Sequence, residues 1–267
     1  MFDFEPLYAP LPDRKAYLDR MGYAGPVRPD LETLNGLVRA HLTHVPFENL
    51  DVYDAEADIP IDIPSLFDKI VTRRRGGYCF ELNALFYALL KDIGFDCYPV
   101  AVRVVWMATR HMPLTHRATI VTIDGKRYFA DVGFGGPAPH EALELDSPDI
   151  QVSDGQRFIF DKSGGDTVLC RVTDQGTERL LQFSEAPCDP VDFLALNEYQ
   201  AKSKNSGFRQ TRMVNLTTPD GSLALTGNVL RRHQNGEVTE TVLKTREELR
   251  AALRDCFGLE VDFELKM

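Results

Sequence analysis

The sequence predicts an α+β protein in which a helical segment is followed by a β segment and then by a mixed α/β segment. Up to about residue 93, apolar residues recur at helical spacing between Pro and Gly breaks. After Gly94, short runs rich in Val, Ile, Tyr and Phe alternate with turn residues, and from Pro187 onward the two patterns mix. A chain of 267 residues is long enough for one large domain or for two to three small ones.

The first segment contains four predicted helices. Asp13 and Asp30 stand before two of them as N-cap residues, and Gly22 and Gly94 stop the first and the fourth. Pro46 ends the second helix and makes the residues after it extended. The predicted helices cover 14–21, 31–42, 63–71 and Cys79–Ile93, and an acidic loop covers 51–62.

The second segment is predicted to form an antiparallel sheet or barrel. Asp124-Gly125 joins two apolar runs and is a strong signal for a two-residue hairpin turn. The predicted strands cover 96–106, 117–123, 127–132, 156–161, 167–173 and 178–183. In the third segment we expect helices at 191–202 and Arg246–Phe257, and strands at 210–217, 222–226, 228–234 and 238–243.

The composition is typical of a globular enzyme, with 43% hydrophobic and 26% charged residues. A net charge of -10 gives no electrostatic case for nucleic-acid binding. No apolar run is long enough for a transmembrane helix, and the N-terminus lacks the basic start and apolar core of a signal peptide. The five cysteines are scattered without a CxxC pair, which argues against zinc and disulfides and favours a reducing cytoplasm.

The central motif is a glycine pair followed by a cysteine, in the run Arg73–Cys79. Cys79 stands at the start of the long apolar helix, where the helix dipole and the preceding arginines favour a thiolate. A single cysteine is more often a small buried apolar residue. Its interpretation as a nucleophile therefore requires a histidine, and a carboxylate or amide that orients the histidine.

His116 is the best candidate for the base, because it stands at the mouth of a predicted strand. It lies eight residues before the Asp124-Gly125 turn and Asp131 lies six residues after that turn, so the hairpin brings the two close together. Asp131 would accept a hydrogen bond from one imidazole nitrogen and set the tautomer. His111 is the rival base, but it lies in a looser stretch, and the hairpin register favours His116.

Taken together, these motifs resemble the arylamine N-acetyltransferase family. The resemblance rests on the run from Arg75 to Asn83, on His116 and on the run that begins at Asp131, Asp-Val-Gly-Phe-Gly. Residues 45–50 and 17–23 add to it, in the family's order and spacing over most of the first half of the chain. The C-terminal third is similar only in its general layout.

The resemblance implies an N-terminal helical bundle, a central antiparallel β-barrel and a C-terminal α/β lid around a cysteine-protease-like Cys-His-Asp core. The implied segments are 1–94, which carries the nucleophile, 95–187, which carries the histidine and aspartate, and 188–267. The implied reaction is a ping-pong transfer of acetyl from acetyl-CoA, through a thioester on Cys79, to an arylamine, arylhydrazine or N-hydroxyarylamine. Neither a metal, a nucleic acid nor a membrane takes part, and no oligomeric state is assigned.

The resemblance also assigns site residues. The catalytic triad of the family falls on Cys79, His116 and Asp131, and its buried ion pair falls on Glu48 and Arg75. Six further residues would line the active site or the path of the pantetheine arm: Phe47, Val104, Trp106, Gly133, Phe134 and Gly135.

Three other functions remain open on the sequence. A related amide synthase or acyltransferase would use the same triad with a longer or carrier-bound acyl donor. A cysteine hydrolase or a transglutaminase-like enzyme would replace the arylamine by water or a lysine. A binding module would keep the fold without turnover, although the presence of all three triad residues argues against it.

Overall fold

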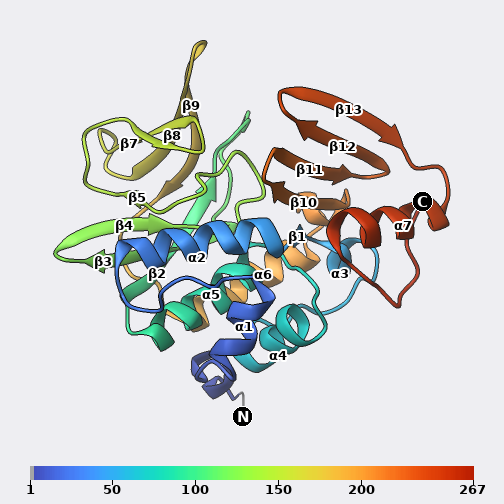
Figure 1. Ribbon diagram of the computed structural model, residues 1–267, viewed down its shortest axis with the longest axis horizontal. Helices are drawn as coiled ribbons and strands as arrows, with labels where there is room; N and C mark the ends of the chain where they lie inside the picture. The colour runs from blue at the N-terminus through green and yellow to red at the C-terminus, as the bar shows by residue number, and fades with distance from the viewer. Residues whose placement is uncertain (1–2) are drawn as a thin grey trace.

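The first third of the chain folds into short helices gathered around one long buried helix (Figure 1). The structure is a computed structural model and describes residues 3–267, so the first two residues of the predicted helical segment lie outside it. Asp13 and Asp30 start their helices by accepting hydrogen bonds from Ala16 N (3.0 Å) and Thr33 N (2.9 Å). Gly94 ends the long helix in a left-handed conformation. The elements are η1 (Glu5–Tyr8), α1 (Arg14–Arg20), α2 (Leu31–His44), α3 (Leu50–Tyr53), α4 (Ile63–Phe67), η2 (Asp68–Thr72) and α5 (Cys79–Ile93).

Two parts of this segment differ from the sequence-based prediction. The helix expected at 63–71 begins as α4 but continues from Asp68 as a π-helical turn. The loop expected at 51–62 contains most of the short helix α3, in which Leu50 and Val52 are buried. One turn among acidic residues is too short for helical periodicity to be visible. The predicted bounds of α5 are confirmed.

Eight antiparallel strands in the middle of the chain curl into a nearly closed barrel (Figure 1). Their order is β5-β4-β3-β2-β9-β8-β7-β6, and the Asp124-Gly125 turn closes the β3–β4 hairpin as predicted. The side chain of Gln151 joins the two edge strands, because it accepts from Glu144 N (2.7 Å) and donates to Glu144 O (2.8 Å). The strands are β2 (Asp96–Val104), β3 (His116–Ile123), β4 (Lys126–Ala130), β5 (Leu143–Glu144), β6 (Gln151–Ser153), β7 (Gln156–Asp161), β8 (Thr167–Thr173) and β9 (Gly176–Phe183).

The barrel also differs from the prediction in several places. Strand β4 ends at Ala130 rather than at residue 132. Strand β2 ends at Val104 rather than at residue 106, because the chain turns there into the loop that leads to β3. Strands β5 and β6 were not predicted, since two and three residues are too few for an alternating pattern.

The last segment forms a five-stranded sheet on which α7 packs (Figure 1). The strand order is β1-β10-β11-β12-β13, so its first strand, β1 (Phe47–Glu48), comes from the N-terminal segment. Phe47 pairs with Asn215 and Glu48 pairs with Val214, antiparallel. The other elements are η3 (Pro190–Asp192), α6 (Phe193–Lys202), η4 (Gly207–Arg209), β10 (Met213–Thr218), β11 (Gly221–Thr226), β12 (Val229–Gln234), β13 (Glu237–Val242) and α7 (Arg246–Phe257).

The hydrophobic cores do not follow the chain order strictly. Phe193 and Ala201 of α6 belong to the core of the helical bundle, although α6 follows the barrel in sequence. Cys97 and Ala130, from barrel strands, belong to that core as well. The bundle, the barrel and α6 are therefore packed against one another around α5. Within residues 3–267, no helix is long and apolar enough to cross a membrane.

Candidate active site

The turn that precedes Cys79 is held by the segment around β1. Glu48 N donates to Gly77 O (2.8 Å), and Gly77 N donates to Pro46 O (3.4 Å). A Cβ atom on Gly76 would lie 2.1 Å from Pro46 O, so only glycine fits there. Two motifs that are far apart in sequence thus meet and fix where α5 begins.

Cys79 is the first residue of α5 and is almost fully buried. Glu81 Oε2 accepts from Tyr78 N (3.0 Å), which satisfies one of the amides at the helix start. The thiol of Cys79 donates to the carbonyl of Thr115 at 3.4 Å. The sulfur thus lies at the N-terminal end of the dipole of α5. The predicted placement of Cys79 at the N-terminus of a buried helix is confirmed.

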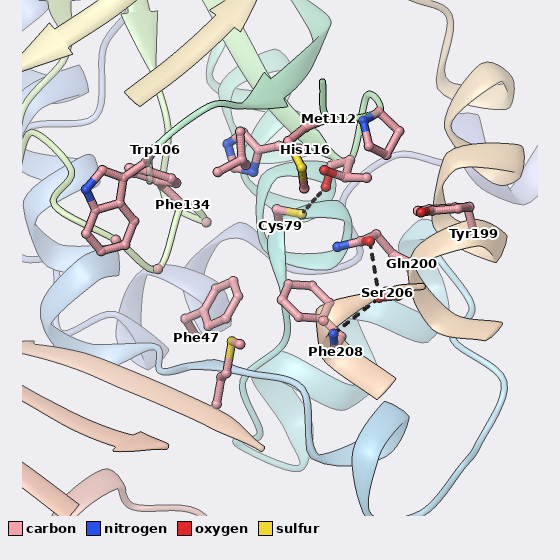
Figure 2. A pocket seen from close by; sticks show the side chains of 18 of the residues that line it. Phe47, Cys79, Trp106, Met112, His116, Phe134, Tyr199, Gln200, Ser206 and Phe208 are labelled. Carbon is pink, nitrogen blue, oxygen red and sulfur yellow. Dashed lines mark hydrogen bonds between the residues drawn. The ribbon is translucent and has the colours of Figure 1, made fainter. Parts of the chain in front are cut away.

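His116, the first residue of β3, lies beside Cys79 in Figure 2 and is buried. Its Nε2 lies 2.6 Å from Asp131 Oδ2. Because a carboxylate only accepts, Nε2 carries the proton and Nδ1 is left for the thiol. Burial alone lowers the pKa of His116, but the charge and hydrogen bond of Asp131, together with Cys79, raise it to about 10. His111 is exposed and, within residues 3–267, makes no hydrogen bond to Asp131.

Asp131 is itself held in place by a side chain of α5. Its Oδ1 accepts from Asn83 Nδ2 (2.9 Å) and from Gly133 N (2.8 Å). Asn83 Oδ1 also accepts from Val132 N at 3.0 Å. Asn83 lies four residues after Cys79, so both project from one face of the helix. The motifs in the sequence indicated no role for Asn83, although its spacing from Cys79 was a usable signal.

A cavity of about 590 Å³ opens onto Cys79 and His116 (Figure 2). The ring of Phe134 stands edge-on to both His116 and Trp106, with centroid distances of 6.0 and 6.2 Å. All six residues that the resemblance assigned to substrate or pantetheine line this cavity: Phe47, Val104, Trp106, Gly133, Phe134 and Gly135. Five aromatic side chains contribute to the walls, which suits a planar ring: Phe47, Trp106, Phe134, Tyr199 and Phe208.

A second cavity, of about 500 Å³, adjoins the first between the barrel and the last sheet. Asn215 Nδ2 donates to Gly135 O (3.1 Å) and ties the two walls together at the junction. Both cavities are lined by Phe47, Trp106, Gly135, Gly136 and Asn215. Together they offer room for a ligand longer than a single aromatic ring.

Chemically, the site holds a thiol, an imidazole and a carboxylate in a row. This is the arrangement of a nucleophile, its base and the group that orients the base. Within residues 3–267, no three His, Cys, Asp or Glu side chains are grouped so that they would hold a metal ion.

Known proteins share this architecture. A family model described as N-acetyltransferase matches residues 30–266. The arylamine N-acetyltransferase of Mycolicibacterium smegmatis is 32% identical over 254 residues, which cover 93% of this chain and 92% of that protein. The chain belongs to the arylamine N-acetyltransferase family.

Two other members of the family extend the comparison. A Salmonella typhimurium protein named arylamine N-acetyltransferase / N-hydroxyarylamine O-acetyltransferase is 32% identical over 237 residues, 88% of this chain and 84% of its own length. The structure of the Mycobacterium marinum arylamine N-acetyltransferase in complex with CoA has a TM-score of 0.86 and 32% identity, and covers 92% of each chain. The expected α+β fold is therefore confirmed, and the likeness extends through the C-terminal third.

The far wall of the cavity is made of residues that no motif of the family resemblance indicated. Phe208 packs edge-on against Phe47 and Tyr78, with ring centroids 5.8 and 5.2 Å apart. The residues on this wall come from α6 to β10: Tyr199, Gln200, Asn205, Ser206, Gly207, Phe208, Met213 and Asn215. Their spacing carries no periodic signal, because folding rather than sequence order brings them to the cavity.

Asn49 fastens this wall to the helical bundle. Its side chain accepts from Met213 N (2.7 Å) and donates to Phe208 O (3.0 Å) and Thr211 O (2.8 Å). Its backbone N–H donates to Met213 O as well (3.2 Å). Since Asn49 is buried, these bonds are shielded from water and set the position of the turn that carries Phe208.

Behind the turn that precedes Cys79 lies an ion network of five side chains: Glu48, Asp51, Lys69, Arg75 and Glu81. Arg75 Nε and Nη2 donate to Glu48 Oε1 (2.9 and 2.7 Å), and Asp51 accepts from both Arg75 and Lys69 (2.7 Å each). Lys69 Nζ reaches Glu81 at 2.6 Å. Burial raises the pKa of Glu81 to about 7, although Lys69 opposes the rise. None of the five lines either cavity.

Proposed function

We propose that this protein is an acetyl-CoA-dependent arylamine N-acetyltransferase and that Cys79, His116 and Asp131 are its catalytic triad. The observation that carries the proposal is the buried row of these three side chains, which opens onto one aromatic-walled cavity. The two cavities together suit an extended thioester donor and a planar acceptor. The CoA complex of the Mycobacterium marinum relative supports the choice of donor.

In the first half-reaction, the Cys79 thiolate attacks the thioester carbonyl of acetyl-CoA. Backbone amides at the start of α5, next to Cys79, stabilise the oxyanion that forms. The intermediate collapses, the bond to the CoA sulfur breaks, and that sulfur takes a proton from His116. Cys79 then carries the acetyl group as a thioester, and CoA leaves.

In the second half-reaction, the arylamine nitrogen attacks the thioester carbonyl on Cys79. His116 accepts the proton that the nitrogen loses, the C–S bond breaks, and the amide departs. Cys79 is again a thiolate beside a protonated imidazole. Asp131 stabilises that imidazolium, consistent with the raised pKa of His116.

The remaining assignments extend the proposal. The pantetheine arm passes Gly133 and Gly135, and Phe47, Val104, Trp106 and Phe134 contact the acceptor or the arm. Residues 1–94, 95–187 and 188–267 act as bundle, barrel and lid; the start of β2 and the end of β9 near these boundaries support the division. Five free cysteines support a reducing, cytoplasmic location, and the net charge of -10 supports a role without nucleic acid.

Intact-mass spectrometry after mixing with acetyl-CoA, without an amine, tests the proposal. The wild-type protein should gain one acetyl group and lose it when an arylamine is added, whereas Cys79→Ala should gain none. Release of CoA without an acetyl adduct would indicate a hydrolase instead. Absence of both adduct and CoA release would indicate a longer or carrier-bound donor, or a binding protein.

A further inference from the structure

One buried cation beside the proposed triad has no acidic partner. Arg117 is the second residue of β3 and is only 3% exposed. Within residues 3–267 its guanidinium forms no ion pair, and its buried Nε has no hydrogen-bond partner. By contrast, the buried side chains of Arg75 and Arg212 each bind a carboxylate, and that of Arg20 binds backbone carbonyls. A buried charge without a partner costs stability, so its presence at this position calls for a reason.

Two aromatic rings hold the guanidinium of Arg117 in place. Its central carbon lies 4.5 Å from the ring centroid of Phe193 on α6 and 5.6 Å from that of Tyr87 on α5. Both distances are within the range of a cation–π contact, which replaces part of the hydration that the cation has lost. Burial lowers the pKa of Arg117 to about 10, which still leaves the side chain charged at pH 7. The fold therefore keeps a positive charge between β3, α5 and α6.

Three groups that can become negative attract this charge: Tyr87, Cys188 and Cys79. Burial raises the pKa of Tyr87 and that of Cys188, so both are neutral at pH 7. Cys79 is the one of the three that the proposed mechanism ionises. Arg117 lines neither of the two cavities that meet at the site, so its charge acts on a group of the protein rather than on a bound substrate.

The backbone of β3 is fixed to the side of α5 that carries Cys79. Cys79, Asn83 and Tyr87 follow one another at intervals of four residues and therefore lie along one face of the helix. Asn83 Nδ2 donates to Arg117 O at 2.6 Å, one turn from the nucleophile. Consecutive residues of a strand point to opposite faces, so the guanidinium is directed away from the imidazole of His116.

We propose that the buried, unpaired charge of Arg117 stabilises the Cys79 thiolate, so that Arg117 acts on the nucleophile without contacting the substrate. The inference rests on the proposed function and adds a residue to the groups that prepare Cys79. The other ionisable groups around the sulfur are His116 on β3, which Asp131 supports, and Tyr78 at the start of α5. Because charges inside a protein are weakly screened, a single one is felt over several ångströms.

The role extends to both half-reactions. The thiolate of Cys79 attacks in the first half-reaction and forms again as the leaving group of the second. A fixed positive charge lowers the energy of the thiolate in each case and does not have to be reorganised when the charge develops.

The test changes the charge of Arg117 and keeps the length of its side chain. Arg117→Met removes the charge, Arg117→Lys retains it, and Arg103→Met is the control. Arg103 on β2 also lacks an ion pair within residues 3–267, but it is partly exposed and lines neither cavity. Alkylation of Cys79 by iodoacetamide is followed as a function of pH, with peptide mass spectrometry to distinguish Cys79 from the other cysteines. Alkylation requires neither acetyl-CoA nor an amine, so it reports on the thiolate independently of the proposed function.

The three variants should separate by charge. Arg117→Met should move the midpoint of the pH profile of alkylation upward by about one pH unit. Arg117→Lys should move it by less than half as much, and Arg103→Met should match the wild type. Below the midpoint, acetylation by acetyl-CoA should be about tenfold slower in Arg117→Met, and the difference should vanish at higher pH. Urea unfolding should show no loss of stability in Arg117→Met, because the charge that it removes is unpaired and buried.

Several outcomes would overturn the proposal. An unchanged midpoint in Arg117→Met would leave Arg117 as a structural contact between β3, α5 and α6, and an equal upward move in Arg117→Lys would show that the charge is not what matters. Arg117→Gln supplies a second neutral variant. If neither neutral variant folds while Arg117→Lys does, the charge is needed for folding and the proposal is wrong. A raised midpoint together with a wild-type protein that transfers no acetyl group would support the role of Arg117 and contradict only the proposed function.

Discussion

Two groups of largely buried ionisable side chains meet the start of α5, and they differ in what they face. The Cys79–His116–Asp131 row opens onto the cavity, with one imidazole nitrogen directed to the thiol. The ion network of Glu48, Asp51, Lys69, Arg75 and Glu81 lies behind the turn, and every one of its charges has a protein partner.

This difference shows how similar interactions can support chemistry in one group and structure in the other. Burial strengthens each electrostatic contact in both groups and raises the cost of losing a partner. In the proposed triad one side faces the cavity, where a reacting group can bind, so we expect its charges to change during turnover. In the ion network every charged group is paired with another side chain, so its charges stabilise the position of the turn before α5. Glu81 links the network to the first turn of α5, because it accepts a hydrogen bond from Tyr78 N.

The largest expected effect comes from Asp131→Asn. The amide cannot stabilise an imidazolium and permits the wrong tautomer, so the rate of Cys79 acetylation should fall by about 10³–10⁴. The matched change in the ion network, Asp51→Asn, should leave that rate within about tenfold of wild type, because Asp51 does not border the cavity. Stopped-flow or quenched mass spectrometry measures both. Equal losses of the acetylation rate in the two variants would contradict the different roles of the two groups.

For the free energy of unfolding we expect a large effect from the ion network. Arg75→Ala should lower the free energy of unfolding by about 3–5 kcal/mol, because it leaves the buried carboxylate of Glu48 without its partner. Arg73, two residues earlier, is a natural control: its side chain is 59% exposed and pairs with Asp68 at 2.8 Å. Arg73→Ala should cost less than about 1 kcal/mol. Urea unfolding curves that coincide for the two variants would contradict the structural role of the network.

A smaller effect is expected from pH. Burial lowers the pKa of His116, but Asp131 and Cys79 raise it to about 10, above the ordinary value of 6.5. The folded protein therefore keeps a proton that the unfolded chain has released. His116 contributes stability that is complete below pH 6.5 and is lost as the pH rises toward 10, with a slope of at most about 1.4 kcal/mol per pH unit. Wild-type urea unfolding should show a steeper decline than His116→Gln over that window, and parallel profiles would be evidence against the raised pKa.

Features that depend on interactions between residues close in sequence could be predicted, and features that depend on contacts between distant segments could not. The bounds of α5 and the Asp124-Gly125 hairpin depend on local periodicity and turn chemistry, and both are confirmed. Short elements such as α3 were not predicted, because a single helical turn has no detectable hydrophobic period. The partners of Asp131 and the wall that carries Phe208 depend on contacts between distant segments, which neither spacing nor composition encodes.

The hydrogen bond between Met213 N and the side chain of Asn49 joins residues that are 164 positions apart. Contacts of such long range are late events in folding, because a long loop must close before they can form. During synthesis, the residues of the bundle and the barrel leave the ribosome before strand β10, which carries Met213. Domains generally fold as they emerge. We therefore expect Cys79, His116 and Asp131 to come together in a nascent chain before the wall that carries Phe208 completes the cavity.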